Sequence, residues 1–145
     1  MSYWDTSALA KLYLPELDSP VFEQKAAGAA PCQIARLAIY EMRRVAFRKE
    51  SEGLIQSGTA ETILNELEQD IAAGDIQVVE LDTALESEFK TVMATCYRNS
   101  PPLLVRTFDA IHVAAARTAG ETEVVATDKR LRVAAKLVGL SLFPV

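Results

Sequence analysis

The chain alternates between short apolar runs and longer segments in which apolar residues recur every three or four positions. The short runs are typical of buried strands, and the longer segments are typical of amphipathic helices. The pattern predicts strands over residues 2–5, 30–35, 76–81, 123–127 and 140–145. It predicts helices over residues 7–14, 21–27, 36–50, 59–73, 83–97, 104–119 and 129–138. This alternation indicates an α/β fold with a largely parallel central sheet of about four to five strands flanked by helices.

Proline and glycine agree with these boundaries. Pro15 ends the first predicted helix, and Gly74 follows the helix over residues 59–73. Pro144 predicts an edge position for the last strand, because proline cannot donate a hydrogen bond to a neighbouring strand. A chain of 145 residues without an internal repeat or a linker predicts a single domain over residues 1–145.

Composition indicates a globular protein. Half of the residues are hydrophobic, and the longest apolar runs fall far short of the ~20 residues that a membrane helix needs. The N-terminal residues carry no basic segment and no apolar block of a signal peptide, so we expect a cytoplasmic protein that does not enter the membrane. Cys32 and Cys96 have no metal-ligand spacing, and we expect both to be reduced and structural.

The formal net charge of −5 and the pI near 4.9 taken alone argue against a nucleic-acid partner. If several acids gather around cations, however, much of this negative charge is neutralised locally. The overall charge therefore does not decide whether the protein binds a nucleic acid.

Four acids occupy unusual positions in the predicted elements. Asp5 and Asp128 each come at the end of a predicted strand, and ligands of parallel sheets bind beyond the carboxyl ends of strands. Glu41 and Asp109 lie in helices, on or beside apolar faces. A buried acid is costly unless it is paired or binds a metal. We expect the four carboxylates to meet in one pocket and to bind divalent metal.

Such a site has a definite chemistry. Carboxylate oxygens suit hard cations, so the sequence favours Mg²⁺ and, in its place, Mn²⁺. A bound ion makes a water nucleophilic near neutral pH, and a second ion can stabilise a leaving oxygen, which favours phosphodiester hydrolysis. Ser7 and Thr127 stand beside the acids and could orient an acid or a water.

Each acid also has a simpler interpretation. Asp5 and Asp128 could be helix N-caps, and Asp109 could be an acid placed in a first turn by the helix dipole. Glu41 could pair with an arginine of its own helix, such as Arg44 or Arg48. The functional interpretation rests on the four acids occurring together.

Other polar and aromatic residues are less decisive. We expect His112, the single histidine, to be packed or hydrogen-bonded, because a site of oxygen ligands does not require imidazole. Arg106 could support Asp109 or contact substrate. Tyr3, Trp4 and Phe108 are predicted core residues. Seven basic residues form solvated helix faces, or some of them hold RNA phosphates: Arg43, Arg44, Arg48, Lys49, Lys129, Arg130 and Arg132.

These motifs resemble the PIN-domain family, in particular the VapC-like toxins of bacterial and archaeal toxin–antitoxin pairs. The resemblance spans residues 3 to 144. It rests on residues 3–9, on Glu41, on residues 106–116 with Asp109, and on residues 127–131, with Gly139 and Pro144 beyond them. The segment before Glu41 lacks the Ser or Thr that often precedes this glutamate in the family.

The resemblance implies a single PIN-like domain with the activity of a Mg²⁺- or Mn²⁺-dependent endoribonuclease. It implies that Asp5, Glu41, Asp109 and Asp128 bind the metal and that the Thr127 hydroxyl assists the last acid. It further implies an RNA substrate, a cognate antitoxin that blocks the site, and a homodimer.

Three other functions stay open at this point. The same fold could act on DNA or in RNA processing, or it could be an inactive structural PIN-like protein, which the presence of all four acids opposes. A third possibility is a non-catalytic α/β regulatory module that is phosphorylated on an aspartate at the end of a middle strand. Asp82 follows the third predicted strand, which we take as the middle one, and is interpreted as the cap of the next helix.

Overall fold

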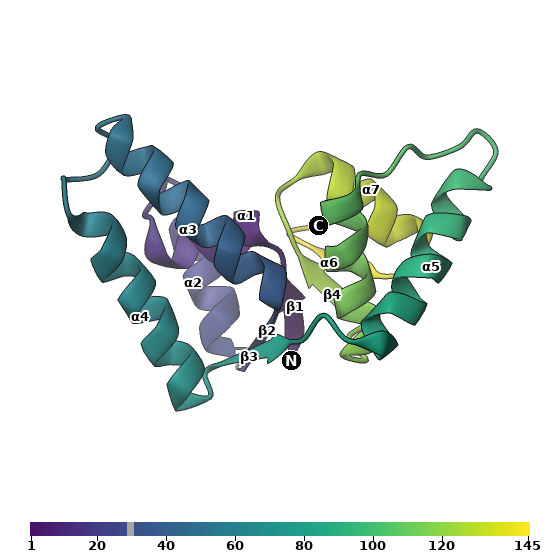
Figure 1. Cartoon of the computed structure of the whole chain (residues 1–145), viewed down its shortest axis with the longest axis horizontal. Helices are drawn as coiled ribbons and strands as arrows, with labels where there is room; N and C mark the ends of the chain where they lie inside the picture. The colour runs from purple at the N-terminus through teal and green to yellow at the C-terminus, as the bar shows by residue number, and fades with distance from the viewer. Residues whose placement is uncertain (29–30) are drawn as a thin grey trace.

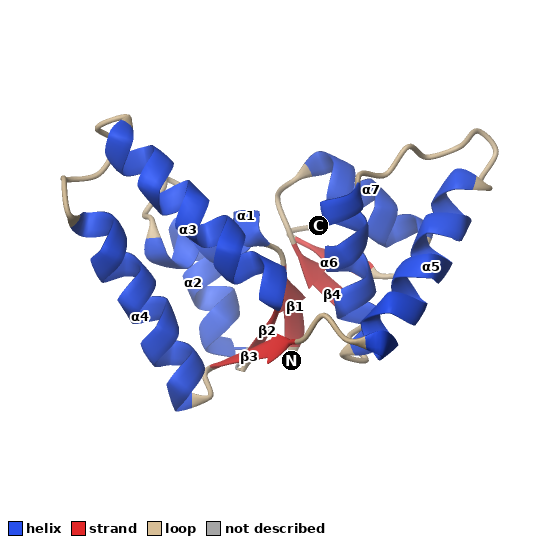
Figure 2. Ribbon diagram, in the orientation of Figure 1, coloured by secondary structure: helices blue, strands red, loops and turns tan. Residues whose placement is uncertain are grey.

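The computed structural model describes residues 1–28 and 31–145, which form a parallel sheet between two layers of helices (Figure 1). The strand order is β3-β2-β1-β4-β5, and every neighbouring pair is parallel (Figure 2). The strands are β1 (Ser2–Trp4), β2 (Cys32–Ala35), β3 (Ile76–Val79), β4 (Glu123–Val125) and β5 (Ser141–Phe143). The helices are α1 (Thr6–Tyr13), α2 (Ser19–Gly28), α3 (Arg36–Ser51), α4 (Thr59–Ala73), α5 (Thr83–Tyr97), α6 (Thr107–Thr118) and α7 (Lys129–Leu137).

Strands β1 and β4 each contribute side chains to the hydrophobic cores on both faces of the sheet. Successive side chains of a strand point to opposite faces of the sheet. Tyr3 and Val124 belong to the core beneath α5, α6 and α7, whereas Trp4 and Val125 belong to the core beneath α1 to α4. All four side chains are fully buried, and each contributes roughly 1.5–3 kcal/mol by leaving water. The carboxyl ends of β1 and β4 are therefore fixed from both sides.

The predicted fold class and the order of elements are confirmed. The predicted start of the second strand at residue 30 lies outside the described residues, and β2 begins at Cys32. β3 and β4 each end two residues earlier than predicted, and β5 is three residues shorter than predicted. As predicted, β5 lies at an edge of the sheet, and Cys32 and Cys96 are buried free thiols.

The helix predicted over residues 104–119 begins only at Thr107, so this boundary was wrong. Arg106 has extended backbone, and the residues before it run alongside the end of α5. There the Leu103 N–H donates to the Cys96 carbonyl, and the Tyr97 hydroxyl donates to the Val105 carbonyl. These contacts satisfy the backbone without a helical turn, and a sequence pattern cannot foresee them.

The assignment of the third strand as the middle strand was also wrong. β3 lies at an edge of the sheet, and β1 is the middle strand, so the acid at the middle position is Asp5. Asp82 is a helix cap, as predicted, because its carboxylate accepts a hydrogen bond from the Leu85 N–H at 3.0 Å. Within the described ranges, none of the helices combines the length and the apolar character needed to cross a membrane.

Candidate functional site

All four predicted acids line one pocket of about 520 Å³. Asp5 and Asp128 stand at the N-termini of α1 and α7, directly after β1 and β4. Asp109 belongs to the first turn of α6, and Glu41 comes from the second turn of α3. The fold therefore gathers side chains that are more than 100 residues apart in the sequence.

Asp5 is the most buried of these acids, with 2% of its surface exposed. Its Oδ1 accepts a hydrogen bond from the Ala8 N–H at 2.8 Å, which caps α1. The Ser7 hydroxyl lies 2.8 Å and 2.7 Å from its two oxygens. Burial raises the pKa of Asp5 to about 6; the bonds from Ala8 and Ser7 oppose this shift, and the charge of Asp128 adds to it. Asp5 is thus both an N-cap and a perturbed carboxylate.

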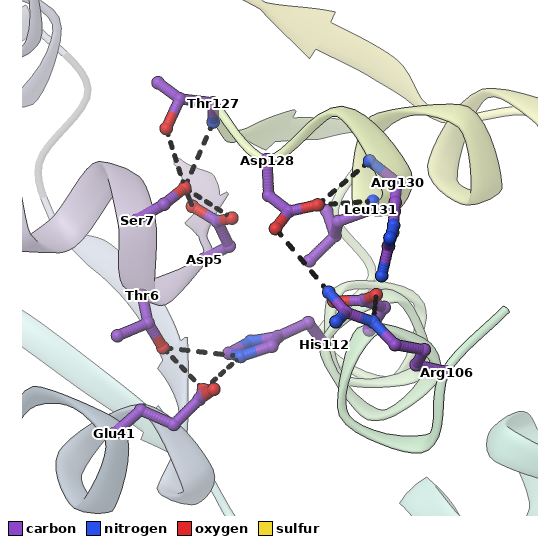
Figure 3. Close-up of polar contacts among 11 residues, drawn as sticks. Asp5, Thr6, Ser7, Glu41, Arg106, His112, Thr127, Asp128, Arg130 and Leu131 are labelled. Atoms are coloured by element: carbon purple, nitrogen blue, oxygen red, sulfur yellow. Dashed lines mark hydrogen bonds and ion pairs between the residues drawn. The ribbon is translucent and has the colours of Figure 1, made fainter. Parts of the chain in front are cut away.

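Thr127 reaches this acid through Ser7. The Thr127 hydroxyl donates to Ser7 Oγ at 2.9 Å, and its backbone N–H does so at 3.2 Å. The structure therefore connects the Thr127 hydroxyl with Asp5, the first acid, by way of Ser7 (Figure 3). The resemblance implied that the Thr127 hydroxyl assists Asp128. Within the described residues, however, Thr127 forms no hydrogen bond with Asp128.

Arg106 bridges the other two acids of this side. Its Nε donates to Asp109 Oδ2 at 3.2 Å, and its Nη2 lies 3.9 Å from Asp128 Oδ2. Asp109 is 7% exposed. Asp128 Oδ1 accepts the backbone N–H groups of Arg130 and Leu131 at 2.9 and 3.1 Å, so it caps α7. Of the two roles expected for Arg106, the structure shows support of the carboxylate.

Glu41 has partners that its own helix does not supply. Its Oε1 accepts hydrogen bonds from the Thr6 hydroxyl and from His112 Nε2, each at 2.6 Å (Figure 3). Burial alone would raise the pKa of Glu41, but the hydrogen bonds from His112 and Thr6, together with the positive charge that His112 carries when protonated, outweigh it and lower the pKa. The expected alternative, an ion pair with Arg44 or Arg48, is not formed within the described part of the chain.

Behind Glu41, the hydrogen bonds continue into the core. His112 is 3% exposed, and its Nδ1 lies 2.6 Å from the Tyr3 hydroxyl, which accepts the Ala35 N–H at 3.2 Å. Burial, followed by the charge of Asp5, raises the pKa of Tyr3 well above its ordinary value. His112 is hydrogen-bonded, as predicted. Tyr3 and Thr6 were not foreseen as its neighbours in this network, although both flank Asp5 in the sequence.

One wall of the pocket is basic. Of the seven basic residues singled out in the sequence, Arg44, Arg48 and Lys49 of α3 line the pocket. Lys11 of α1 also lines the pocket, and the sequence analysis did not identify it as a site residue. It follows Ser7 by four positions and therefore lies on the same face of α1. It is 8% exposed and forms ion pairs with Glu16 and Asp18 at 2.7 and 2.8 Å.

Phe108 is not a core residue, so this prediction was wrong. Its side chain is 55% exposed and lines the pocket. The neighbouring apolar residues Val105 and Ala110 pack into the core instead, whereas Phe108 lies on the side of α6 that lines the pocket. Tyr3 and Trp4 are fully buried, as predicted.

The donor set fits Mg²⁺ or Mn²⁺ in chemistry, because all four predicted ligands offer carboxylate oxygens. Across residues 1–28 and 31–145, however, no three acid, histidine or cysteine side chains are close enough to hold one ion together. Protein donors engage each carboxylate in this arrangement. Asp5 accepts from Ala8 and Ser7, Asp109 from Arg106, Asp128 from two N–H groups of α7, and Glu41 from Thr6 and His112. Binding an ion requires some of these carboxylates to turn.

Comparison with known proteins identifies the family of the chain. The sequence model of the PIN domain matches residues 2–137. The chain therefore belongs to the PIN domain family, and this membership supports a nuclease activity. No curated protein matches the chain significantly.

Several solved structures share its fold at low sequence identity. FitAcB from Neisseria gonorrhoeae has a TM-score of 0.65 at 15% identity, covering 99% of this chain and 96% of its own. Mycobacterium tuberculosis VapC20, a toxin that cleaves the sarcin–ricin loop, has a TM-score of 0.67 at 16% identity, covering 92% and 95%. VapBC2 from Rickettsia felis, bound to promoter DNA, has a TM-score of 0.66 at 12% identity, covering 98% and 97%.

Proposed function

We propose that this PIN domain is a metal-dependent endoribonuclease and the toxin of a toxin–antitoxin pair. The observation that carries the proposal is the convergence of Asp5, Glu41, Asp109 and Asp128 on one pocket of a PIN domain. Hydroxyl and histidine partners hold two of these acids at defined positions. A solvated cluster of unrelated acids would not be tied to the core in this way.

In this proposal, the four carboxylates hold Mg²⁺, for which Mn²⁺ can substitute. A bound ion would activate a water and neutralise charge on the scissile phosphate. Thr127 and Ser7 keep Asp5 oriented, since their hydroxyls form a continuous chain to its oxygens. Asp109 lies in the first turn of α6, and Arg106 pairs with its carboxylate and compensates its charge while no ion is bound.

The basic wall supports RNA as the substrate. Arg44 and Arg48 are exposed side chains on the pocket-facing side of α3, where they can contact phosphates on either side of the scissile bond. The exposed Phe108 ring offers a surface on which an unpaired base can stack. Single-stranded RNA provides both groups, as does single-stranded DNA, whereas the bases of a duplex are paired inside the helix.

The partner assignments follow the same proposal. The similar structures include the toxin–antitoxin complexes VapBC2 and VapBC of Salmonella typhimurium, the latter with a TM-score of 0.62 at 19% identity, covering 98% of this chain and 96% of its own. We therefore propose a cognate antitoxin that blocks the carboxylate pocket. A homodimer and a cytoplasmic location belong to the same proposal.

The test is cleavage of a labelled RNA and of DNA of the same sequence by purified protein in Mg²⁺, Mn²⁺ or EDTA. Asp109→Asn is the test variant, and Glu68→Gln, an exposed acid of α4 away from the pocket, is the matched control. We expect metal-dependent RNA cleavage, lost by at least ~100-fold in Asp109→Asn, because a ligand matters at least as much as groups that orient ligands. Equal cleavage by Asp109→Asn would refute the site, and cleavage of DNA alone would refute the substrate.

A further inference from the structure

A chain of hydrogen bonds runs from the backbone of β2 to the carboxylate of Glu41. It passes from the Ala35 N–H to the Tyr3 hydroxyl, to His112, and then to Glu41 Oε1 (Figure 3 shows its outer end). We propose that His112 is a positioning residue that fixes Glu41 for a divalent cation and that Tyr3 fixes the tautomer of His112. The inference rests on the proposed metal-dependent function and assigns a role to the single histidine.

The direction of the bonds follows from the number of hydrogens available. The Tyr3 oxygen already accepts the Ala35 N–H, and its own O–H needs an acceptor in a buried place. In the described part of the chain, His112 Nδ1 at 2.6 Å is the acceptor within reach. Nδ1 therefore carries the lone pair, and the hydrogen of the neutral ring resides on Nε2, which donates to Glu41 at 2.6 Å.

The same geometry determines which oxygen of Glu41 is left for a ligand. Oε1 accepts both the His112 bond and the Thr6 bond, whereas no hydrogen bond to Oε2 is formed by the described residues. A glutamate side chain loses considerable rotamer freedom when it binds an ion. Because His112 and Thr6 restrict that freedom beforehand, Glu41 can offer Oε2 at a smaller entropic cost.

The position of His112 ties together two sides of the pocket. It lies on α6 one turn after Asp109, and it is buried between β1, α1 and α3. One helix thus carries one predicted ligand and the group that orients another. Buried side-chain polar atoms in the described residues all have hydrogen-bond partners. Loss of the imidazole would leave the Tyr3 O–H without its acceptor and would leave Glu41 Oε1 with the Thr6 bond alone.

The first experiment measures Mn²⁺ affinity by electron paramagnetic resonance on the full chain, independently of activity. His112→Phe keeps a ring but removes both nitrogens, and we expect ~10-fold weaker Mn²⁺ binding, in the range found when groups behind a metal ligand are removed. His112→Gln can return an N–H to Glu41 and should recover most of that loss. Circular dichroism and urea unfolding establish that each variant is folded.

Thr6→Val is a second variant in case His112→Phe does not fold. It removes the other bond to Oε1 at nearly constant volume and should weaken Mn²⁺ binding by a smaller factor. Thr118→Val is its control, because Thr118 bonds only the Ala114 carbonyl within α6. Equal effects of Thr6→Val and Thr118→Val would overturn the inference.

A double-mutant cycle separates positioning from general damage. If His112 acts through Glu41, His112→Phe should weaken Mn²⁺ binding in the native chain but have no further effect in Glu41→Gln. An equal loss in both backgrounds would overturn the proposal. If the native chain binds no Mn²⁺, the proposed metal-dependent function itself fails, which is a different result.

The tautomer provides an independent check. Because the chain contains one histidine, its ¹⁵N resonances need no assignment by mutagenesis. We expect protonated Nε2 and unprotonated Nδ1 in the native chain, and loss of this preference in Tyr3→Phe. Protonated Nδ1 in the native chain would overturn the assigned direction of the bonds.

Discussion

Two sides of one pocket differ in charge and in how they are built. The acidic floor consists of Asp5, Asp109 and Asp128, and the basic wall consists of Arg44, Arg48 and Lys49. Two floor acids cap helices through backbone N–H groups, and the third sits in the first turn of α6. The wall arginines are exposed side chains of one helix.

The difference separates two tasks. Short aspartates held by backbone groups have little freedom, which suits precise placement of a metal and its water. Long arginines reach into solvent and can follow a flexible, charged ligand. A net charge of −5 conceals this arrangement, because it does not show that basic side chains gather on one side of the pocket and carboxylates on the other.

The largest expected effect is on protein stability and concerns Asp5, the most buried acid of the floor. Asp5→Asn should make the metal-free protein more stable at pH 7.5, by up to ~3 kcal/mol, because a raised pKa means that ionising this carboxyl destabilises the fold. In the unfolded chain the pKa of Asp5 lies near its ordinary value of 3.8, and in the folded protein it is raised to about 6. The stability that the protonated acid contributes is therefore lost as the pH rises from about 4 to about 6.

Urea unfolding in EDTA across this pH range checks the prediction. Native protein and Asp5→Asn should have nearly equal stability at pH 4 and diverge as the pH rises. If Asp5→Asn were instead the less stable protein at pH 7.5, the bonds from Ala8 and Ser7 would outweigh burial, and the floor would be a stabilising feature of the metal-free fold.

The next effect concerns the wall. Replacing both Arg44 and Arg48 by Gln should weaken binding of single-stranded RNA by about 10-fold at moderate salt, because two phosphate contacts are lost. The slope of log affinity against log salt should fall by up to ~1.4, about 0.7 for each contact. Filter binding with Asp109→Asn as the background keeps the RNA intact.

Arg43→Gln is the matched control for the wall. Arg43 belongs to the same helix but pairs with Glu61 at 3.2 Å and does not line the pocket. It removes one positive charge from α3, against two in the double variant, so an equal loss of RNA affinity per charge removed would mean that the charge of the whole helix matters. A loss confined to the double variant would assign the contacts to the wall.

The smallest expected effect concerns Arg106, the basic side chain that pairs with two acids of the floor. Arg106 is more than half exposed and compensates Asp109 and Asp128. Arg106→Gln should tighten Mn²⁺ binding about two- to threefold, since a partly exposed ion pair that competes with the metal is worth only ~0.5 kcal/mol. Titration calorimetry measures it, with Lys90→Gln on α5 as a charge-matched control. Weaker Mn²⁺ binding in Arg106→Gln would instead mean that Arg106 positions Asp109 and Asp128 for the metal.

Much of the fold was predictable because local patterns determine its elements. The helix over residues 83–97 was predicted at its observed bounds, and its start depends on a cap that lies next to it in the sequence, Asp82. The helix predicted from residue 104 begins later, since its start depends on contacts with α5. That the four acids line one pocket was predictable, because strand ends and apolar helix faces are visible in a sequence.

The sequence by itself determined the order of strands and helices, the positions of the four acids and the match to the PIN domain family. These features depend on residues close together in the chain. Only the tertiary structure decided that β1 is the middle strand, that Phe108 is exposed, and that Thr6 and His112, rather than an arginine of α3, hold Glu41. Such contacts join segments separated by 35 to 109 residues, and packing of the two helix layers on the sheet determines which of these segments meet.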